Sequence, residues 1–189
     1  MDLAQAQFDA IGIELNPQAA AFAVRRGHRV LAGDFLDIPV SENTYDVVVC
    51  LATLEHLQYP DRYLAKIALS LKPGGLFYCS TCDIDSWFAR LSGAHWRMIH
   101  PPTHLSYFST NTLDRLLNRY GLTVIEWKRF WQYRSVGTGI HAITRRSTRL
   151  AGVYRLLDQM GVTGWTMTFN FGDLIFGVAR KQPNGDTHI

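Results

Sequence analysis

Glu14 is the first residue whose type and position suggest binding chemistry. It stands near the end of Ala10–Leu15, a run of apolar and β-branched residues that predicts a short strand buried on both faces. Asn16 is a good N-cap and Pro17 suits the first helical position, so a helix is expected directly afterwards. Open α/β sheets bind ligands at the carboxyl edge of their strands, where a carboxylate could accept hydrogen bonds from both hydroxyls of a ribose. A surface glutamate in a strand–helix turn is the alternative.

Asp34 and Phe35 form a second candidate pair. They follow a short predicted strand, Arg29–Ala32, and Gly33. The carboxylate of Asp34 could accept a hydrogen bond from an amino group, and the ring of Phe35 could pack on a flat ring. The alternative is an aspartate cap before the turn at Asp37–Pro39 and a phenylalanine that belongs to the core.

The segment Asp83–Phe108 differs in composition from the rest of the chain. Its residues of interest are aromatic, histidine or proline: Trp87, His95, Trp96, His100, Pro101, Pro102, His104, Tyr107 and Phe108. Loops that carry such side chains beside a ligand-binding edge are where substrate contacts concentrate. A packed cover of the sheet, with its histidines bonded to backbone groups, is the alternative. A helix is expected within it, through Ser86–Leu91.

The cysteines predict neither a disulfide framework nor a metal site. The chain has three, an odd number, which is simplest to explain by a reducing, cytoplasmic compartment. Cys79 and Cys82 form a CxxC at the end of a predicted strand, whereas redox pairs sit at a helix N-terminus. A zinc site would need a second pair of ligands, and Cys50 is the only other cysteine.

Strands and helices alternate along the chain, which predicts an α/β sheet of parallel type. The strongest strand signal is Tyr45–Ala52, a β-branched run typical of a central parallel strand. A helix follows it and ends at Lys72–Gly75, where proline cannot continue the helix. The other expected elements are strands at Leu76–Ser80, Leu122–Arg129 and Leu174–Arg180, and a helix that Ser109 caps.

Size and charge limit the classes of protein to consider. The 189 residues are 47% hydrophobic and carry a net charge of +3, which is too mild to argue for nucleic acid. No secretion signal is apparent, and the longest apolar run, Val47–Leu54, falls short of the roughly 20 residues that span a bilayer. We expect one domain over residues 1–181, with a loose tail over 182–189.

A helical insertion is expected over residues 131–169. Its amphipathic helix carries Leu150, Val153, Tyr154 and Leu157, and Arg145, Arg146 and Arg149 precede it. Such a helix would pack on its own domain or, as the less favoured alternative, touch a membrane surface.

The order of these motifs resembles that of class I S-adenosylmethionine-dependent methyltransferases, in particular the subgroup resembling ubiquinone-biosynthesis O-methyltransferases. The matching pieces are Glu14, Gly33–Phe35, Tyr45–Cys50 with Leu54–His56, Leu71–Gly75, and His100–Ser109. The resemblance covers roughly Phe8–Arg129 and Gly172–Lys181. It implies a Rossmann-like methyltransferase sheet, mostly parallel with an antiparallel last strand, and methyl transfer to a small-molecule acceptor.

The resemblance also implies roles for single residues. The residues expected to bind S-adenosylmethionine are Glu14, Leu15, Gly33, Asp34, Phe35, Leu51 and Ala52. Among them, Glu14 would hold the ribose, Asp34 and Phe35 the adenine, and Leu51 and Ala52 the methionine part. Trp96, His100 and Tyr107 would face the acceptor. A hydroxyl acceptor would need a base, and His56 or His104 could serve.

One departure from the resemblance is large. The first strand and the glycine-rich loop of the family should precede Met1–Phe8, and they are absent from the sequence given. We therefore expect either a fragment or a sheet that another segment or chain completes, with weak cofactor binding and self-association through unpaired strand edges. A non-catalytic interaction module on the same fold and a Rossmann NAD(P)-dependent oxidoreductase are the alternative functions.

Overall fold

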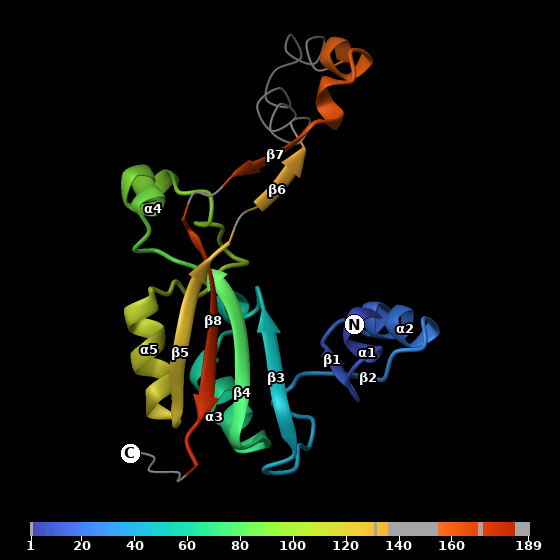
Figure 1. Ribbon diagram of the computed structural model, residues 1–189, viewed down its shortest axis with the longest axis vertical. Coiled ribbons are helices and arrows are strands. Elements are labelled where there is room, and N and C mark those ends of the chain that lie inside the picture. Colours follow the sequence, from blue (N-terminus) through green and yellow to red (C-terminus); the bar gives the residue numbers. More distant parts are fainter. Residues whose placement is uncertain (1, 131, 136–154, 170–171, 184–189) are drawn as a thin grey trace.

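A four-stranded mixed sheet forms the centre of the computed structural model, which describes residues 2–130, 132–135, 155–169 and 172–183 (Figure 1). Its strands lie in the order β3 (Tyr45–Leu51), β4 (Leu71–Cys82), β8 (Leu174–Lys181) and β5 (Leu122–Arg129). β3 and β4 are parallel, and β8 runs antiparallel to both of its neighbours. The prediction of a Rossmann-like α/β sheet with an antiparallel last strand is confirmed.

The helices α3 (Pro60–Ser70) and α5 (Thr110–Arg119) pack against one face of this sheet. The fully buried core joins them to Phe77 of β4 through Leu64, Ile67, Leu113, Leu117 and Ile175. α5 begins where the sequence predicted, because Ser109 and Thr112 form a reciprocal capping box. These two helices fix the positions of the segments that leave the carboxyl ends of β3 and β4.

A second, two-stranded parallel sheet consists of β1 (Gly12–Glu14) and β2 (Val30–Ala32). The helix α2 (Pro17–Arg25) connects its strands, and α1 (Asp2–Gln5) precedes it. As predicted, the side chain of Asn16 caps α2 by accepting hydrogen bonds from two backbone amides. Figure 1 shows this unit on the β3 side of the central sheet, and no strand pairing joins β1 to β3 among the described residues.

The prediction that β1 and β3 are buried on both faces is wrong. Ile11 and Ile13 are only half-buried, and Val49 of β3 is 59% exposed. Among the described residues, each of these strands has a neighbour on one side only, so a pattern typical of a central strand belongs here to an edge strand.

β4 begins earlier than the sequence predicted. It starts at Leu71, whereas Leu76–Ser80 was expected, because Leu71 already pairs with Tyr45. The register then shifts, and Leu76 pairs with Val47. The predicted turn at Lys72–Gly75 is this irregular stretch, in which Gly74 has a φ of +81°.

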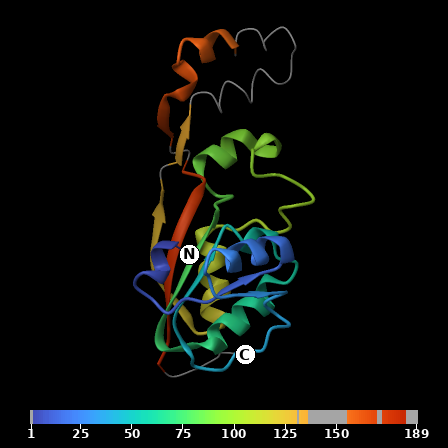
Figure 2. The same ribbon diagram turned by 90° about the vertical axis from the view of Figure 1, so that its right-hand side faces the viewer.

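The remaining elements lie on the side of the central sheet where β3, β4 and β5 have their carboxyl ends (Figure 1). They are the short helices η1 (Leu54–His56), α4 (Trp87–Ser92), η2 (Gly93–His95) and η3 (Val162–Gly164), and the hairpin of β6 (Gln132–Ser135) with β7 (Thr166–Phe169). The hairpin extends beyond the central sheet (Figures 1 and 2).

The hairpin corrects the expectation of a purely helical insertion. Residues 155–159 are helical, but most of the predicted amphipathic helix, including Leu150, Val153 and Tyr154, and the three arginines before it lie outside the described residues. In the part of the chain that is described, no helix has the length and apolarity needed to cross a membrane.

Candidate functional site

The segment Asp83–Phe108 lies at the carboxyl ends of β3 and β4, as predicted. It leaves β4 at Asp83 and returns to form a bridge between Asp83 and Phe108. Before it returns, the backbone amides of Leu105 and Ser106 donate to the carbonyl oxygen of Glu55 in η1, at 2.8 and 3.1 Å. The segment is therefore held against the turn that follows β3.

This attachment brings Glu55, His56 and His104 together. The carboxylate of Glu55 is 5% exposed and accepts a hydrogen bond from the hydroxyl of Thr81 at 2.8 Å. The rings of His56 and His104 lie 4.7 Å apart in an edge-to-face arrangement. The sequence singled out both histidines but gave Glu55 no role of its own, although its place beside His56 after the strongest strand was a usable signal.

Backbone carbonyls fix the orientation of both rings. Nδ1 of His56 lies 2.7 Å from the oxygen of Thr103, and Nδ1 of His104 lies 2.8 Å from the oxygen of Met98. A carbonyl oxygen can only accept, so each Nδ1 carries the hydrogen, and Nε2 of each neutral ring is left with its lone pair. Either Nε2 can take up a proton or bind a metal ion.

The three residues expected to face the acceptor do not share one environment. His100 and Tyr107 lie near His104, with ring centroids at 6.2 and 6.4 Å from its own. Trp96 is 2% exposed, and its Nε1 donates to Asp173 at 3.0 Å. Its ring centroid lies 6.3 Å from that of Tyr107, so Trp96 is a buried neighbour of that residue.

Two buried carboxylates anchor this segment, and sequence reasoning found neither. Asp173, 2% exposed, accepts hydrogen bonds from Arg97 at 2.8 and 3.1 Å as well as from Trp96. Asp83, 1% exposed, pairs with Arg129 at 3.0 Å. Their partners lie far away in the sequence, so no local pattern could have indicated these contacts.

Glu14 and Leu15 lie where the sequence predicted, at the carboxyl edge of β1. Oε1 of Glu14 accepts from the amide of Asn16 at 2.8 Å, which leaves its second oxygen for a ligand. The amide of Gly33 donates to the carbonyl of Glu14 at 2.9 Å, so the ends of β1 and β2 adjoin. Leu15 is 70% exposed.

Asp34 is held by a tyrosine of α3. Its Oδ1 accepts from the hydroxyl of Tyr63 at 2.5 Å and from the amide of Leu36 at 2.8 Å. These two hydrogen bonds lower the pKa of Asp34 below its usual value, and the bond from the Tyr63 hydroxyl has the larger effect. The ring of Phe35 lies 5.9 Å from that of Tyr63, and Nζ of Lys66 lies 5.2 Å from its centroid.

Leu51 and Ala52 lie at the carboxyl end of β3. Leu51 is 52% exposed, and Ala52 has a φ of +47°, which is uncommon for a residue other than glycine. The amide of Ala52 donates to the carbonyl of Ser80 at 2.9 Å, which holds this turn against β4. Residues with such sparsely populated backbone conformations cluster at ligand sites.

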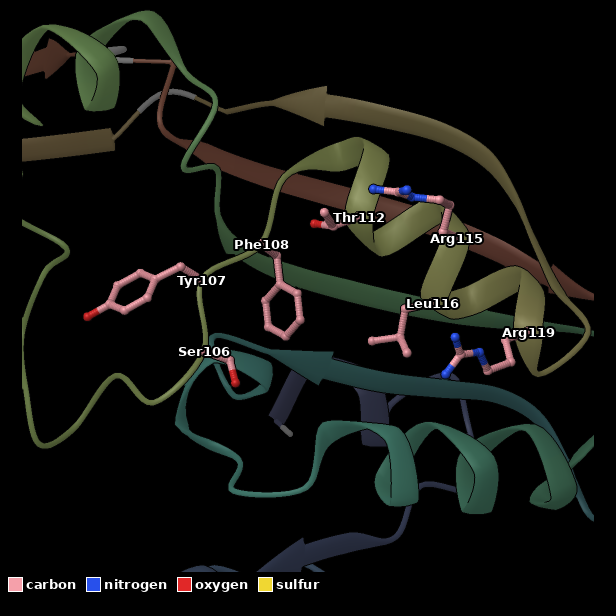
Figure 3. Close-up of a pocket in the computed structure, with 7 residues that line it drawn as sticks. All are labelled: Ser106, Tyr107, Phe108, Thr112, Arg115, Leu116 and Arg119. Carbon is pink, nitrogen blue, oxygen red and sulfur yellow. The ribbon is translucent and has the colours of Figure 1, made fainter.

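A shallow pocket of about 490 Å³ lies between the end of the Asp83–Phe108 segment and α5 (Figure 3). Its lining residues are Ser106, Tyr107, Phe108, Thr112, Arg115, Leu116 and Arg119. Tyr107 is the one predicted site residue among them. The pocket is therefore beside the candidate site and shares one wall with it.

Comparison with known proteins identifies the family. The model of the methyltransferase domain family matches residues 2–127. A ubiquinone biosynthesis O-methyltransferase of Burkholderia pseudomallei is 30% identical over 108 residues, which are 54% of this chain and 43% of that protein. The mitochondrial enzyme of the same name from Candida albicans is 35% identical over 86 residues, 44% of this chain and 24% of that protein. The matches thus span less than half of these relatives.

Solved structures show the same fold. A SAM-dependent methyltransferase from Thermotoga maritima has a TM-score of 0.59 and 18% identity, covering 91% of this chain and 72% of that one. One from Archaeoglobus fulgidus has a TM-score of 0.62 and 14% identity, covering 95% and 80%. The resemblance of the motifs is confirmed, with S-adenosylmethionine as the cofactor of the family. The family model matches more than half of this chain, and the chain therefore belongs to the methyltransferase domain family.

Proposed function

We propose that this chain contributes the cofactor and acceptor sites for methyl transfer from S-adenosylmethionine to a small molecule. The observation that carries the proposal is the placement of Glu14, Asp34 and Ala52 at the carboxyl ends of β1, β2 and β3. Ligands of open α/β sheets bind at this edge. The order of the three positions along the chain is that of the family's motifs.

The adenosine half of the cofactor is assigned to the β1–β2 unit. The free oxygen of Glu14 would accept from the ribose hydroxyls. The carboxylate of Asp34, kept charged by Tyr63, would accept from the adenine amino group. Leu51 and Ala52 would adjoin the methionine half, and Leu15, Gly33 and Phe35 complete the proposed cofactor site.

The acceptor is assigned to the side of His56 and His104. Methyl transfer is an in-line displacement at a sulfonium, so positioning supplies most of the rate. A hydroxyl acceptor must also lose a proton, and Nε2 of either histidine is free to accept it. His100 and Tyr107 would contact the acceptor. Transfer to an oxygen atom is favoured, because several relatives are named O-methyltransferases. The aromatic side chains of the Asp83–Phe108 segment favour a small or partly apolar acceptor.

Calorimetric titration with S-adenosylhomocysteine tests the assignment. Glu14→Ala should weaken binding by about 1.5–3 kcal/mol, the range for a hydrogen bond to a charged group. Glu42→Ala removes an exposed acid outside the proposed site and should leave the affinity unchanged. Equal affinities of Glu14→Ala and the unmodified chain, with unchanged circular dichroism, would remove Glu14 from the site.

A non-catalytic interaction module is the second candidate function. The observation that favours it is that β1 and β3 belong to different sheets. The proposed cofactor site takes residues from both strands, and no strand pairing among the described residues holds the two halves of that site together. A folded chain that binds neither S-adenosylhomocysteine nor NADH would support the module. Binding of NADH alone would instead support an oxidoreductase.

A further inference from the structure

The β1–β2 unit, residues 2–40, is attached to the rest of the molecule at one place. Its two strands form a sheet of their own, and Figure 1 shows the unit beside the β3 edge of the central sheet. Within the described part of the chain, three hydrogen bonds join residues 2–40 to the residues after position 44. Tyr63 and Lys66 of α3 donate all three. The unit is therefore held through α3.

Lys66 makes two of these hydrogen bonds. Its Nζ donates to the carbonyl oxygen of Leu36 at 2.7 Å and to that of Ile38 at 2.6 Å. The same ammonium lies 5.2 Å from the ring centroid of Phe35, within the range of a cation–π contact. One side chain thus contacts three residues of the turn that follows β2.

Asp34 organises the turn that Lys66 contacts. Its side chain accepts from the amide of Leu36 at 2.8 Å, and its carbonyl oxygen accepts from the amides of Asp37 and Ile38 at 3.0 and 3.2 Å. The carbonyls of Leu36 and Ile38 take no part in these bonds and accept from Lys66 instead. An ammonium group has three N–H donors, so it can bridge two carbonyl oxygens. The position of Lys66 therefore fixes the whole turn.

The helix α3 is a firm support for this turn. Its Leu64 and Ile67 are 0% and 3% exposed and belong to the core beneath the central sheet. Tyr63 and Lys66 stand three positions apart and so lie on the same side of the helix. The ring of Phe35 packs against the same core. A displacement of the turn would have to break these contacts or move a helix that the core fixes.

We propose that Lys66 is a positioning residue, which holds the turn Asp34–Ile38 on α3 and thereby places the β1–β2 unit relative to the carboxyl end of β3. The cofactor would span both parts, with its adenosine half on the unit and its methionine half beside Leu51 and Ala52. Two linked halves bind more tightly than one only where both sites can be reached at once. The effect on the cofactor rests on the proposed function, whereas the attachment of the unit does not.

Sequence reasoning gave Lys66 no role. A lysine on an amphipathic helix is usually a solvated surface residue. Here its partners Leu36 and Ile38 lie 30 and 28 positions earlier in the chain, so no local pattern could indicate the contact.

Hydrogen exchange tests the attachment without any cofactor. Lys66→Met removes the ammonium and keeps an unbranched, flexible side chain, so the fold should be retained. We expect amide exchange over residues 30–38 to become faster by about tenfold or more, as for the loss of hydrogen bonds to a charged group. Exchange in β4 and β8 should stay unchanged.

Two further variants serve as controls for the exchange experiment. Lys66→Arg retains donors for both carbonyls and should behave like the unmodified chain. Lys72→Met removes a lysine that pairs with Asp46 at the start of β3, outside the turn, and should leave exchange over residues 30–38 unchanged.

Calorimetry tests the consequence for the cofactor. The two ligands are S-adenosylhomocysteine and S-inosylhomocysteine, whose purine carries an oxo group in place of the amino group. The unmodified chain should prefer the amino form, because the carboxylate of Asp34 would accept from it. Lys66→Met should weaken S-adenosylhomocysteine binding by about tenfold or more and reduce this preference. A loss of stability alone would weaken both ligands equally.

Three results would overturn the proposal: unchanged exchange over residues 30–38 in Lys66→Met, unchanged affinity of that variant for S-adenosylhomocysteine, or equal weakening of both ligands. In each case a normal affinity of the unmodified chain would leave the proposed function standing. If the unmodified chain does not bind S-adenosylhomocysteine but exchange becomes faster in Lys66→Met, the proposed function is wrong and the attachment through Lys66 is supported.

Discussion

The hydrogen bond between Tyr63 and Asp34 links the proposed adenine site to α3. It is the largest of the effects that lower the pKa of Asp34. A carboxyl whose pKa is lower in the folded chain than its unfolded value of about 3.9 contributes stability above that value. This contribution is lost as the pH falls through the lower, folded pKa.

Tyr63→Phe should raise the pKa of Asp34 toward its ordinary value, because the hydroxyl that donates to the carboxylate is removed. The cost in unfolding free energy should be about 1 kcal/mol at neutral pH and should shrink in acid. NMR titration of the Asp34 carboxyl measures the shift. Tyr59→Phe removes a hydroxyl that is not among the causes of the shift and should leave the pKa of Asp34 unchanged. A pKa that stays low without the Tyr63 hydroxyl would contradict the assignment.

The cysteines should be inert in the folded chain. Burial is the main cause that raises the pKa of Cys50 and Cys82 to about 11 and of Cys79 to about 12. Thiolates are the reactive form, and less than about one in a thousand of these groups is ionised at neutral pH. We expect labelling by a disulfide reagent to be slow without denaturant and fast in urea. Rapid labelling of the native protein would contradict the burial of these thiols.

At the scale of elements, the Asp83–Phe108 segment owes its position to Asp173. This carboxylate lies just before β8 and bonds Trp96 and Arg97, both from the middle of the segment. The side chain of Arg97 is 30% exposed while that of Asp173 is 2% exposed, so the acid is the member that needs its partners most. Its loss leaves a buried indole N–H without an acceptor.

Asp173→Ala should therefore lower the unfolding free energy by about 2–4 kcal/mol, as expected when one partner of a buried charge pair is removed. Tryptophan fluorescence should shift because Trp96 loses its hydrogen bond. Asp85→Ala, which removes an exposed acid paired with Arg90, should cost far less. Denaturant unfolding of both variants measures the difference, and equal costs would argue against an anchoring role for Asp173.

Local patterns were enough to predict most elements. Asn16 and Ser109 cap helices as expected, and the bounds of β5 are those predicted, because caps and periodicity act over a few residues. The sequence could not reveal which strands lie at an edge or that Glu55 meets His104, since both depend on distant partners. The β6–β7 hairpin was missed because its strands are short and about 30 residues apart.

At the scale of the whole molecule, the two edges of the central sheet differ in chemistry. Within the part of the chain that the structure describes, β3 pairs with a strand on one side only, and its Val47, Val49 and Leu51 are 40%, 59% and 52% exposed. They lie on the face opposite α3 and α5, because Val48 and Cys50 between them pack against the core. β5, at the other edge, carries the charged residues Glu126, Lys128 and Arg129.

Self-association should therefore proceed through β3 and not through β5. Unpaired apolar edges invite pairing with another chain, whereas charges on an edge oppose it. We expect light scattering to show a mass that rises with protein concentration, and Val49→Lys to suppress this rise. The substitution should cost little stability, because Val49 is 59% exposed.

The matched control is Ile125→Lys, since Ile125 is 53% exposed on β5 and the substitution is chemically the same. If the apolar β3 edge is the cause, Ile125→Lys should leave the concentration dependence unchanged. A suppression equal to that of Val49→Lys would mean that added positive charge alone prevents association. A constant monomer mass at all concentrations would mean that β3 is protected in solution, and the edge argument would then fail.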